Sequence, residues 1–576
     1  MILLQFVTAQ LLIDFGTQFI KTTTIKNRKP DIVLDHQSKR KILNCVAYTT
    51  NLWVGNDCQS YLTRKPTQVA MSSKLLLPLL NDEKDIVPFY SSIFPVPISN
   101  QNLIKLDMEY SVIDIFAILI NQIQEYHDPI NKSKDIYLIL PYYYDYKLKY
   151  KIQQLSSILN TTITLLNENT MTMVQYAQSN QLPQHFESNK EADQIYMVFD
   201  MGHSTTMSLY KVKYHSTSAI TSVNTMGLSI ECLFQSHNEQ GGYNIDLLIR
   251  NELVAAFIKK YPKSKESINT NKRALMQLLV QAQRIKHVLS ANSQVQVQIE
   301  QLHDDHDFKH VMTRTEFEAL LIPIDIKSPI NELFTNSKIP ISDISSVIVV
   351  GGTSRIPWIQ DQLTSIIGDK LSWQVDGTEG TAMGAAYYYM TQSPRFIMKP
   401  YNVSDIIHYD VYLNSTLIFP KYSRVGIKKY LSFVRDDDYD FTLYVNKDAA
   451  YAVTIGNVKW ASSKVQNAIK SKTRVLIEIN KSGLISVGGA SYDAQIMPLE
   501  PEKVETPTPE ETPEETSSEE GVTPKESPSP DATPTTAPKP IKLSYPLTVD
   551  IKYLMADLSD ADIIASTTRY SLINVD

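Results

Sequence analysis

The sequence predicts an α/β domain made of two facing halves, followed by a β-sandwich that carries an acidic insertion. Three observations predict this fold class. Two distant stretches share one pattern: an apolar strand, Asp, any residue, Gly and a returning strand. A third apolar strand runs into Gly351-Gly352, and short alternating strands fill residues 405 to 499. One Asp-x-Gly hairpin is weak evidence, whereas a matched pair upstream of a Gly-Gly turn strongly indicates a duplicated domain.

Composition sets wide limits on the function. The chain has 576 residues, of which 43% are hydrophobic and 20% charged, as expected of a soluble protein with more than one domain. A net charge of −7 gives no reason to expect nucleic-acid binding. No apolar run is long enough for a membrane span, and three cysteines are too few for a disulfide framework.

The two hairpins predict a site for a phosphorylated ligand. The first places Asp14 before Gly16, and the second places Asp200 before Gly202. We expect the two carboxylates at the strand tips near a magnesium ion and its waters, and the backbone amides around the glycines to hold phosphates.

The strand that ends in Gly351-Gly352 predicts close approach of a ligand to the backbone, because no Cβ intervenes. Arg355 would lay its flat guanidinium on a purine ring, and Ile356 would add apolar contact. A polar segment, residues 359 to 367, should be helical. On this motif alone, an ordinary strand-to-helix turn is about as good an interpretation.

These motifs occur in the order found in one family, and residues 10 to 395 resemble the actin-like ATPase domain of the heat shock protein 70 superfamily. The resemblance implies ATP and Mg²⁺ as cofactors, with the metal held mostly through water by Asp14 and Asp200. It assigns catalytic roles to Lys74, Asp14, Glu168, Asp200 and Thr205. It assigns nucleotide contacts to Gly16, Thr17, Gln18, Gly202, His203, Ser204, Gln283, Lys286, His287, Ser290, Gly351, Gly352, Thr353, Arg355 and Ile356.

Several positions depart from the family pattern. Without the family, Lys74 is an ordinary lysine at a helix edge. For His203, a solvated turn histidine is a more usual interpretation than an added phosphate contact. Pro141 matches a proline switch that links the nucleotide to the second domain, but Lys149 stands where the switch arginine is usual, and a lysine lacks the arginine's fork of hydrogen bonds. Asn169 replaces a turn proline.

The second hairpin departs furthest, because Met207 occupies the position of a later aspartate, and Gln18 replaces a threonine in the first. Losing one positioned electrostatic group commonly costs about 3 kcal/mol, or ~10²-fold in rate. Binding is spread over many contacts. We therefore expect ATP binding with slow hydrolysis.

The predicted domains are an actin-like nucleotide-binding domain at 10–392, a linker at 393–404 and a β-sandwich substrate-binding domain at 405–576. Residues 1–9 are interpreted as a clipped signal peptide, or else as an early start of the first strand. Residues 500–540 hold ten of the 29 prolines and eleven acidic residues against three lysines, which predicts a disordered loop. A last sandwich strand should follow it, and residues 557–576 should begin a truncated helical lid.

The linker lacks the acidic, leucine-rich character of ordinary members. It resembles that of the large lumenal branch, the 170-kDa glucose-regulated proteins and their fungal counterparts. This resemblance implies a place in the endoplasmic reticulum lumen, with a cytoplasmic protein as the alternative. Glycosylation sequons, which suit the lumen, occur at Asn131, Asn160, Asn402, Asn414 and Asn480.

Three functions remain open. The first is an atypical chaperone that binds ATP and serves as nucleotide exchange factor and co-chaperone for the conventional lumenal chaperone BiP. The second is an ATP-regulated holdase or foldase that binds unfolded polypeptides directly. The third, a sugar kinase on the same actin-like fold, leaves the β-sandwich and the acidic loop without a purpose. We rank them in that order.

Overall fold

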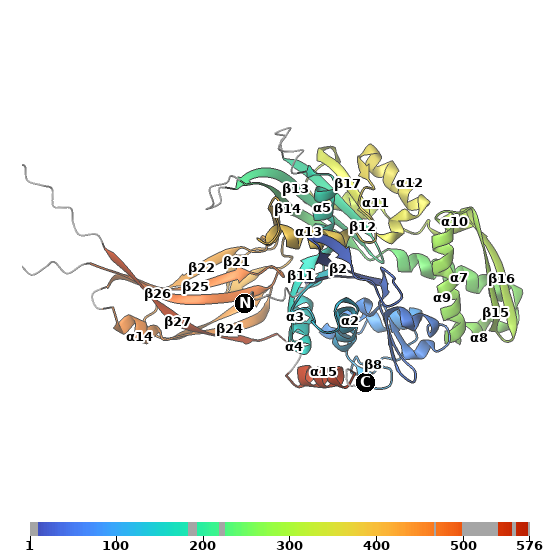
Figure 1. Ribbon diagram of the computed structural model, residues 1–576, viewed down its shortest axis with the longest axis horizontal. Coiled ribbons are helices and arrows are strands. Elements are labelled where there is room, and N and C mark those ends of the chain that lie inside the picture. Colours follow the sequence, from blue (N-terminus) through green and yellow to red (C-terminus); the bar gives the residue numbers. More distant parts are fainter. Residues whose placement is uncertain are drawn as a thin grey trace, which may run out of the picture.

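The computed structural model describes residues 10–182, 193–217, 225–465, 468–497, 540–555 and 560–573. The interpreted signal segment, residues 1–9, and nearly all of the acidic insertion, up to residue 539, lie outside these residues. Two mixed sheets, each covered by helices, stand beside an elongated all-β region (Figure 1). This arrangement confirms the predicted fold class.

The first lobe is built on a sheet with the order β11-β10-β1-β2-β3, in which β4 also pairs with β2. Strands β1 and β2 form the first predicted hairpin, and β10 and β11 lie parallel to β1. The bounds are β1 Leu11–Phe15, β2 Phe19–Lys26, β3 Lys29–Ile32, β4 Ile42–Leu43, β10 Asp135–Leu140 and β11 Thr162–Asn167.

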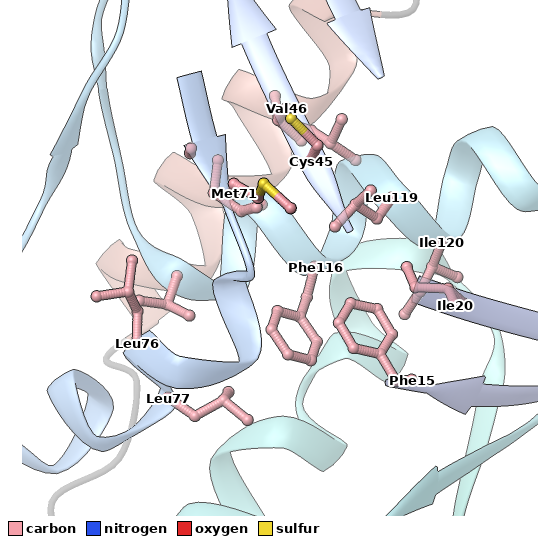
Figure 2. Close-up of a cluster of buried hydrophobic side chains, with 14 of the residues drawn as sticks. Phe15, Ile20, Cys45, Val46, Met71, Leu76, Leu77, Phe116, Leu119 and Ile120 are labelled. Carbon is pink, nitrogen blue, oxygen red and sulfur yellow. The ribbon is translucent and has the colours of Figure 1, made fainter. Parts of the chain in front are cut away.

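A subdomain of small sheets and helices completes this lobe. Helix α2 starts with a capping box between Ser111 and Asp114, and its apolar face packs on β1, where Phe116 stacks on Phe15 at 4.0 Å between ring centroids (Figure 2). The bounds are β5 Cys45–Tyr48, β6 Leu52–Val54, β7 Val69–Met71, β8 Ile104–Lys105, β9 Glu109–Tyr110, η1 Gly55–Ser60, η2 Pro66–Gln68, η3 Ser73–Asn81, α1 Ile86–Ile93, α2 Val112–His127, α3 Tyr146–Gln153, α4 Leu155–Leu159 and α5 Glu168–Ser179.

The second lobe repeats the plan with a sheet of order β18-β17-β12-β13-β14-β19. Strands β12 and β13 form the second predicted hairpin, and β17, which ends before Gly351, lies parallel to β12. The strands are β12 Gln194–Met201, β13 Thr205–Thr217, β14 Thr225–Asn238, β15 Gln294–His303, β16 His306–Thr313, β17 Ile344–Val350, β18 Leu371–Ser372 and β19 Tyr401–Ser404.

The helices of the second lobe confirm two sequence predictions. The apolar spacing around residues 275 to 289 forms α9, and residues 359 to 367 lie in α12. The helices are α7 Gly242–Lys260, η4 Pro262–Ser264, α8 Lys265–Thr270, α9 Lys272–Leu289, α10 Arg314–Leu320, α11 Lys327–Ser337, η5 Ile341–Asp343, η6 Gly352–Arg355, α12 Pro357–Ile367, η7 Gly368–Lys370 and α13 Gly380–Gln392.

The C-terminal region is one curled antiparallel sheet of eight strands, in the order β21-β20-β23-β24-β27-β26-β25-β22. The predicted turn at Asn480 to Gly483 joins β25 and β26, and β27 is the strand expected after the insertion. The bounds are β20 Val411–Leu413, β21 Thr416–Phe419, β22 Lys428–Phe433, β23 Tyr439–Val445, β24 Asp448–Gly456, α14 Val458–Ser463, β25 Ala468–Ile479, β26 Ile485–Ile496 and β27 Ile541–Tyr553.

The all-β region is docked on the two lobes. Part of the expected linker, β19, adds a parallel strand to β14 and so extends the second-lobe sheet. The backbone amide of Leu165 in the first lobe donates to Ser482 Oγ of the β25–β26 turn at 3.0 Å. Helix α15, Asp560–Ile573, packs on α2 and α4 of the first lobe (Figure 1). Among the described helices, none has the length and apolar content that a membrane crossing requires.

Candidate nucleotide-binding site

A cavity of about 230 Å³ lies where the two lobes meet, lined by both predicted hairpins. Most of the predicted site residues border it, and they come from six separate stretches of the chain. They are Asp14, Gly16, Thr17, Gln18, Lys74, Glu168, Asp200, Gly202, His203, Ser204, Lys286, His287, Ser290, Gly351, Gly352, Thr353 and Ile356. Thr205, Gln283 and Arg355 do not border it.

The first hairpin carries its own counter-ion. Asp14 and Lys21 face each other across β1 and β2, and Lys21 Nζ lies 2.6 Å from Asp14 Oδ2. The turn is tight, since a Cβ on Gly16 would come within 2.2 Å of the Phe19 carbonyl oxygen. Asn44 Nδ2 donates to the Gly16 carbonyl at 3.0 Å and fixes it further. The turn is therefore tightly packed, and the charge of Asp14 is neutralised by Lys21.

The second hairpin places Thr206, not a lysine, opposite Asp200. Among the described residues Asp200 has no ion-pair partner, and burial, reinforced by Glu168 and Asp14, raises its pKa to about 7. The Gly202 carbonyl accepts bonds from Thr353 Oγ1 at 2.7 Å and from the Gly242 amide at 2.8 Å. Met207, at the position of the family's aspartate, is fully buried. The second hairpin is thus held by neighbouring loops rather than by charge.

One hydrogen bond joins the two hairpins across the cavity. Thr17 Oγ1 and His203 Nδ1 lie 3.0 Å apart, although 186 positions separate them in the chain. Burial lowers the pKa of His203 to about 3, so the imidazole is neutral at physiological pH. His203 is partly exposed, and its ring nitrogen contacts the other hairpin.

The predicted catalytic pair is in contact. Lys74, in the first turn of η3, is buried, and its Nζ lies 2.5 Å from Glu168 Oε1 at the start of α5. Burial raises the pKa of Glu168, and the Lys74 ammonium opposes part of that rise. Lys74 is therefore no ordinary lysine at a helix edge.

The α7 and α9 helices supply a third ion pair. Lys286 Nζ lies 2.7 Å from Asp246 Oδ1 and also donates to the Gly242 carbonyl at 3.2 Å. Gln283 lies on the same helix, three positions before Lys286, but it does not border the cavity. Ser290 and His287, one helical turn or less from Lys286, do border it.

The Gly-Gly turn follows the predicted plan except at its arginine. Gly351 has φ +88°, and a Cβ there would come within 2.4 Å of the Met201 backbone, so glycine is required. A Cβ on Gly352 would meet no atom within 4 Å. Arg355 points to solvent, where its guanidinium lies 3.6 Å from Asp376. Thr205, a predicted catalytic residue of the second hairpin, does not border the cavity, and its Oγ1 donates to the Gln240 carbonyl at 2.9 Å.

Sequence reasoning missed several residues that border the cavity: Lys21, Lys41, Tyr143, Tyr243 and Asp246. The register of the first hairpin would have revealed Lys21, because the residues that flank a short turn face each other. Tyr243 connects the lobes through its hydroxyl, 2.5 Å from Ser72 Oγ. No local pattern points to Lys41 or Tyr143.

The residues fit a nucleotide with a water-bound magnesium ion better than a metal cage. Among the described residues, no group of three or more His, Cys, Asp or Glu side chains could hold a metal. Three of the four cavity carboxylates are already paired with lysines, and only Asp200 is not. Gly16, Gly202 and Gly352 border the same cavity, so their backbone amides are available to a phosphorylated ligand.

Comparison with known proteins identifies the same family as the sequence motifs. The family model described as Hsp70 protein matches residues 11–494. Hypoxia up-regulated protein 1 of Danio rerio is 26% identical over 472 residues, which cover 76% of this chain and 47% of that protein. Heat shock protein 70 homolog lhs1 of Schizosaccharomyces pombe is 28% identical over 433 residues, which cover 71% of this chain and 49% of that protein.

The chain thus spans about half the length of these two relatives. Both belong to the large branch that the linker indicated, so that prediction is confirmed. Since the family model covers most of the chain and most of the residues that the family pattern assigns border the cavity, this chain belongs to the Hsp70 protein family.

Proposed function

We propose that this chain is an atypical Hsp70-type chaperone that binds ATP with Mg²⁺ and acts as nucleotide exchange factor and co-chaperone for the lumenal chaperone BiP. One observation carries the proposal: β19 joins the docked all-β region to the same sheet whose strands β12 and β17 end at the cavity. A ligand that fixes this sheet therefore also fixes the docked shape. Exchange activity needs that shape more than it needs hydrolysis.

The residues support binding with slow turnover. Asp14, Glu168 and Asp200 border the cavity together with the glycine turns that would hold the phosphates, and Asp200 would face the hydrated metal. When bound, magnesium would supply positive charge to the phosphates. The chain's own residues would bind and orient the nucleotide. Lys74 is held by Glu168 at 2.5 Å, and Met207 cannot replace a carboxylate, which supports weak hydrolysis.

The lumenal location also belongs to this proposal. Four of the five sequon asparagines are exposed: Asn131, Asn160, Asn402 and Asn414. Asn480 is less accessible, because its Oδ1 accepts bonds from two amides of the β25–β26 turn. The proposed domain limits, 10–392, 393–404 and 405–576, agree with this scheme, with residues 401–404 acting as a docking strand.

The test is release of a fluorescent nucleotide from purified BiP, with and without this chain preloaded with ATP. We expect a large acceleration. Gly352→Asp should abolish it, because the new carboxylate would enter open space beside the phosphates. Gly352→Ala is the matched control and should keep it, since a Cβ there meets nothing within 4 Å.

Absence of acceleration, while the chain still binds unfolded polypeptide, would refute the exchange factor. It would leave the second candidate, an ATP-regulated holdase or foldase. That candidate is favoured by the curled eight-stranded sheet, the kind of surface that the family uses for extended polypeptides.

A further inference from the structure

The charges around the cavity are arranged unevenly. Four carboxylates and four lysines border it. Three pairs are in contact: Asp14 with Lys21 at 2.6 Å, Glu168 with Lys74 at 2.5 Å, and Asp246 with Lys286 at 2.7 Å. Asp200 and Lys41 remain outside these pairs in the described part of the chain.

Lys21 differs from the other paired lysines in its position. Its Nζ lies against the tip of the first hairpin, so close that a Cβ on Gly16 would be 3.2 Å away. The side chain is 14% exposed, and the pairing of β1 with β2 fixes it opposite Asp14. The Lys21 side chain therefore stands beside the turn whose amides would hold the phosphates.

This ammonium lies where a divalent cation would otherwise act. Asp14 is one of the two carboxylates expected to attract magnesium, and Lys21 already neutralises it. A second cation that approaches Asp14 would be repelled by the ammonium, whereas an anionic phosphate would be attracted to it. Charge that magnesium usually supplies is thus partly built into the chain.

We propose that Lys21 is a built-in counter-ion that makes binding of a nucleoside triphosphate at this cavity depend only weakly on Mg²⁺. The proposal rests on the nucleotide binding proposed above, and it adds that the positive charge beside the phosphates comes from Lys21. Lys21 acts on the phosphates directly and on Asp14 by pairing with it.

The experiment measures ATP affinity of the full chain by calorimetry, in excess Mg²⁺ and in excess EDTA. For the wild-type chain we expect the two dissociation constants to agree within about tenfold. Lys21→Met removes one charged hydrogen-bonding partner, so the ratio of the two constants should rise by about tenfold or more. Mg²⁺ should restore much of the variant's affinity. Lys21→Arg keeps the charge and should keep the wild-type ratio.

Two further variants separate this effect from a general loss of positive charge. Lys41→Met removes a cavity lysine outside the pairs and should weaken binding in both buffers alike. Lys26→Met makes the same change on β2 outside the cavity, where Lys26 is 60% exposed and lies 3.6 Å from Asp31. It should leave both constants unchanged.

A loss of roughly 100-fold in EDTA for the wild-type chain would overturn the proposal, as would an unchanged ratio in Lys21→Met. If Lys21→Met does not fold, the wild-type ratio and Lys21→Gln decide by the same criteria. Failure to bind ATP in either buffer would refute the proposed function as well. Strong binding that depends steeply on Mg²⁺ would refute only the role of Lys21.

Discussion

The two hairpins that meet at the cavity share one sequence pattern but differ in their electrostatics. In the first, Lys21 lies opposite Asp14 and neutralises it at 2.6 Å. In the second, Thr206 lies opposite Asp200, which keeps a raised pKa of about 7. A duplicated motif therefore places both carboxylates in equivalent positions, while the residue across the strand decides what each can do.

The hairpins also differ in how their turns are held. Gly16 is packed against its own turn, whereas a Cβ on Gly202 would meet only Asp200 Oδ1, at 3.9 Å. The second turn is instead anchored through the Gly202 carbonyl to Thr353 and Gly242. In the first hairpin the carboxylate is thus paired with a lysine of the same hairpin, whereas Asp200 in the second has no lysine partner in the described structure.

The largest expected effect tests this difference in packing. Gly16→Ala forces a Cβ to within 2.2 Å of the Phe19 carbonyl oxygen, so the turn must move, and we expect a loss of about 3 kcal/mol. Gly202→Ala should change stability by no more than about 0.5 kcal/mol. Urea unfolding, with hydrogen exchange of the β1 and β12 amides to separate the lobes, measures both. Equal losses of stability in the two variants would contradict the proposed difference in packing between the two turns.

A smaller effect tests the charges. Asp14→Asn leaves the Lys21 ammonium, which is 14% exposed, without its carboxylate, and should destabilise the nucleotide-free chain by roughly 2 kcal/mol. Asp200→Asn removes a half-buried carboxylate that has no lysine partner in the described structure, and should be neutral or stabilising. Thermal unfolding without nucleotide measures both changes.

A double-mutant cycle checks that the first loss comes from the pair. In Asp14→Asn combined with Lys21→Met neither charge remains, so most of the stability should return. Additive losses in the cycle would show that Asp14 acts through something other than Lys21.

Local patterns in the sequence predicted much of this site. In each hairpin the strand, the Asp, the Gly and the returning strand follow one another along the chain, so the sequence predicts both hairpins. Local patterns also predict the turn at Gly351, helix α9 and strand β27. The ion pair of Lys21 needed the register of the hairpin, which a motif search ignores. The pairing of β19 with β14 depends on how two distant segments pack. Such contacts are fixed by tertiary structure, and no local pattern encodes them.

The smallest effect concerns the hydrogen bond that joins the hairpins. Burial lowers the pKa of His203 to about 3 from its usual 6.5. Below pH 6.5 the unfolded chain takes up a proton that the folded chain does not, so stability present above pH 6.5 is lost as the pH falls toward 3. Because His203 is half-buried, we expect about 1 kcal/mol to be lost by pH 5.5.

The variant His203→Asn isolates this contribution. Asparagine has no titration in this range and keeps a donor and an acceptor for Thr17, so unfolding measured from pH 7.5 to 5 should show a shallower slope. The slope of the variant must be subtracted from that of the wild-type chain, because other histidines also contribute to it. Burial lowers the pKa of His408, for example, to about 3. Thr17→Val removes the bond but not the burial, and should keep most of the slope. A slope that vanishes in Thr17→Val would mean that the bond between the hairpins, and not burial, keeps His203 neutral.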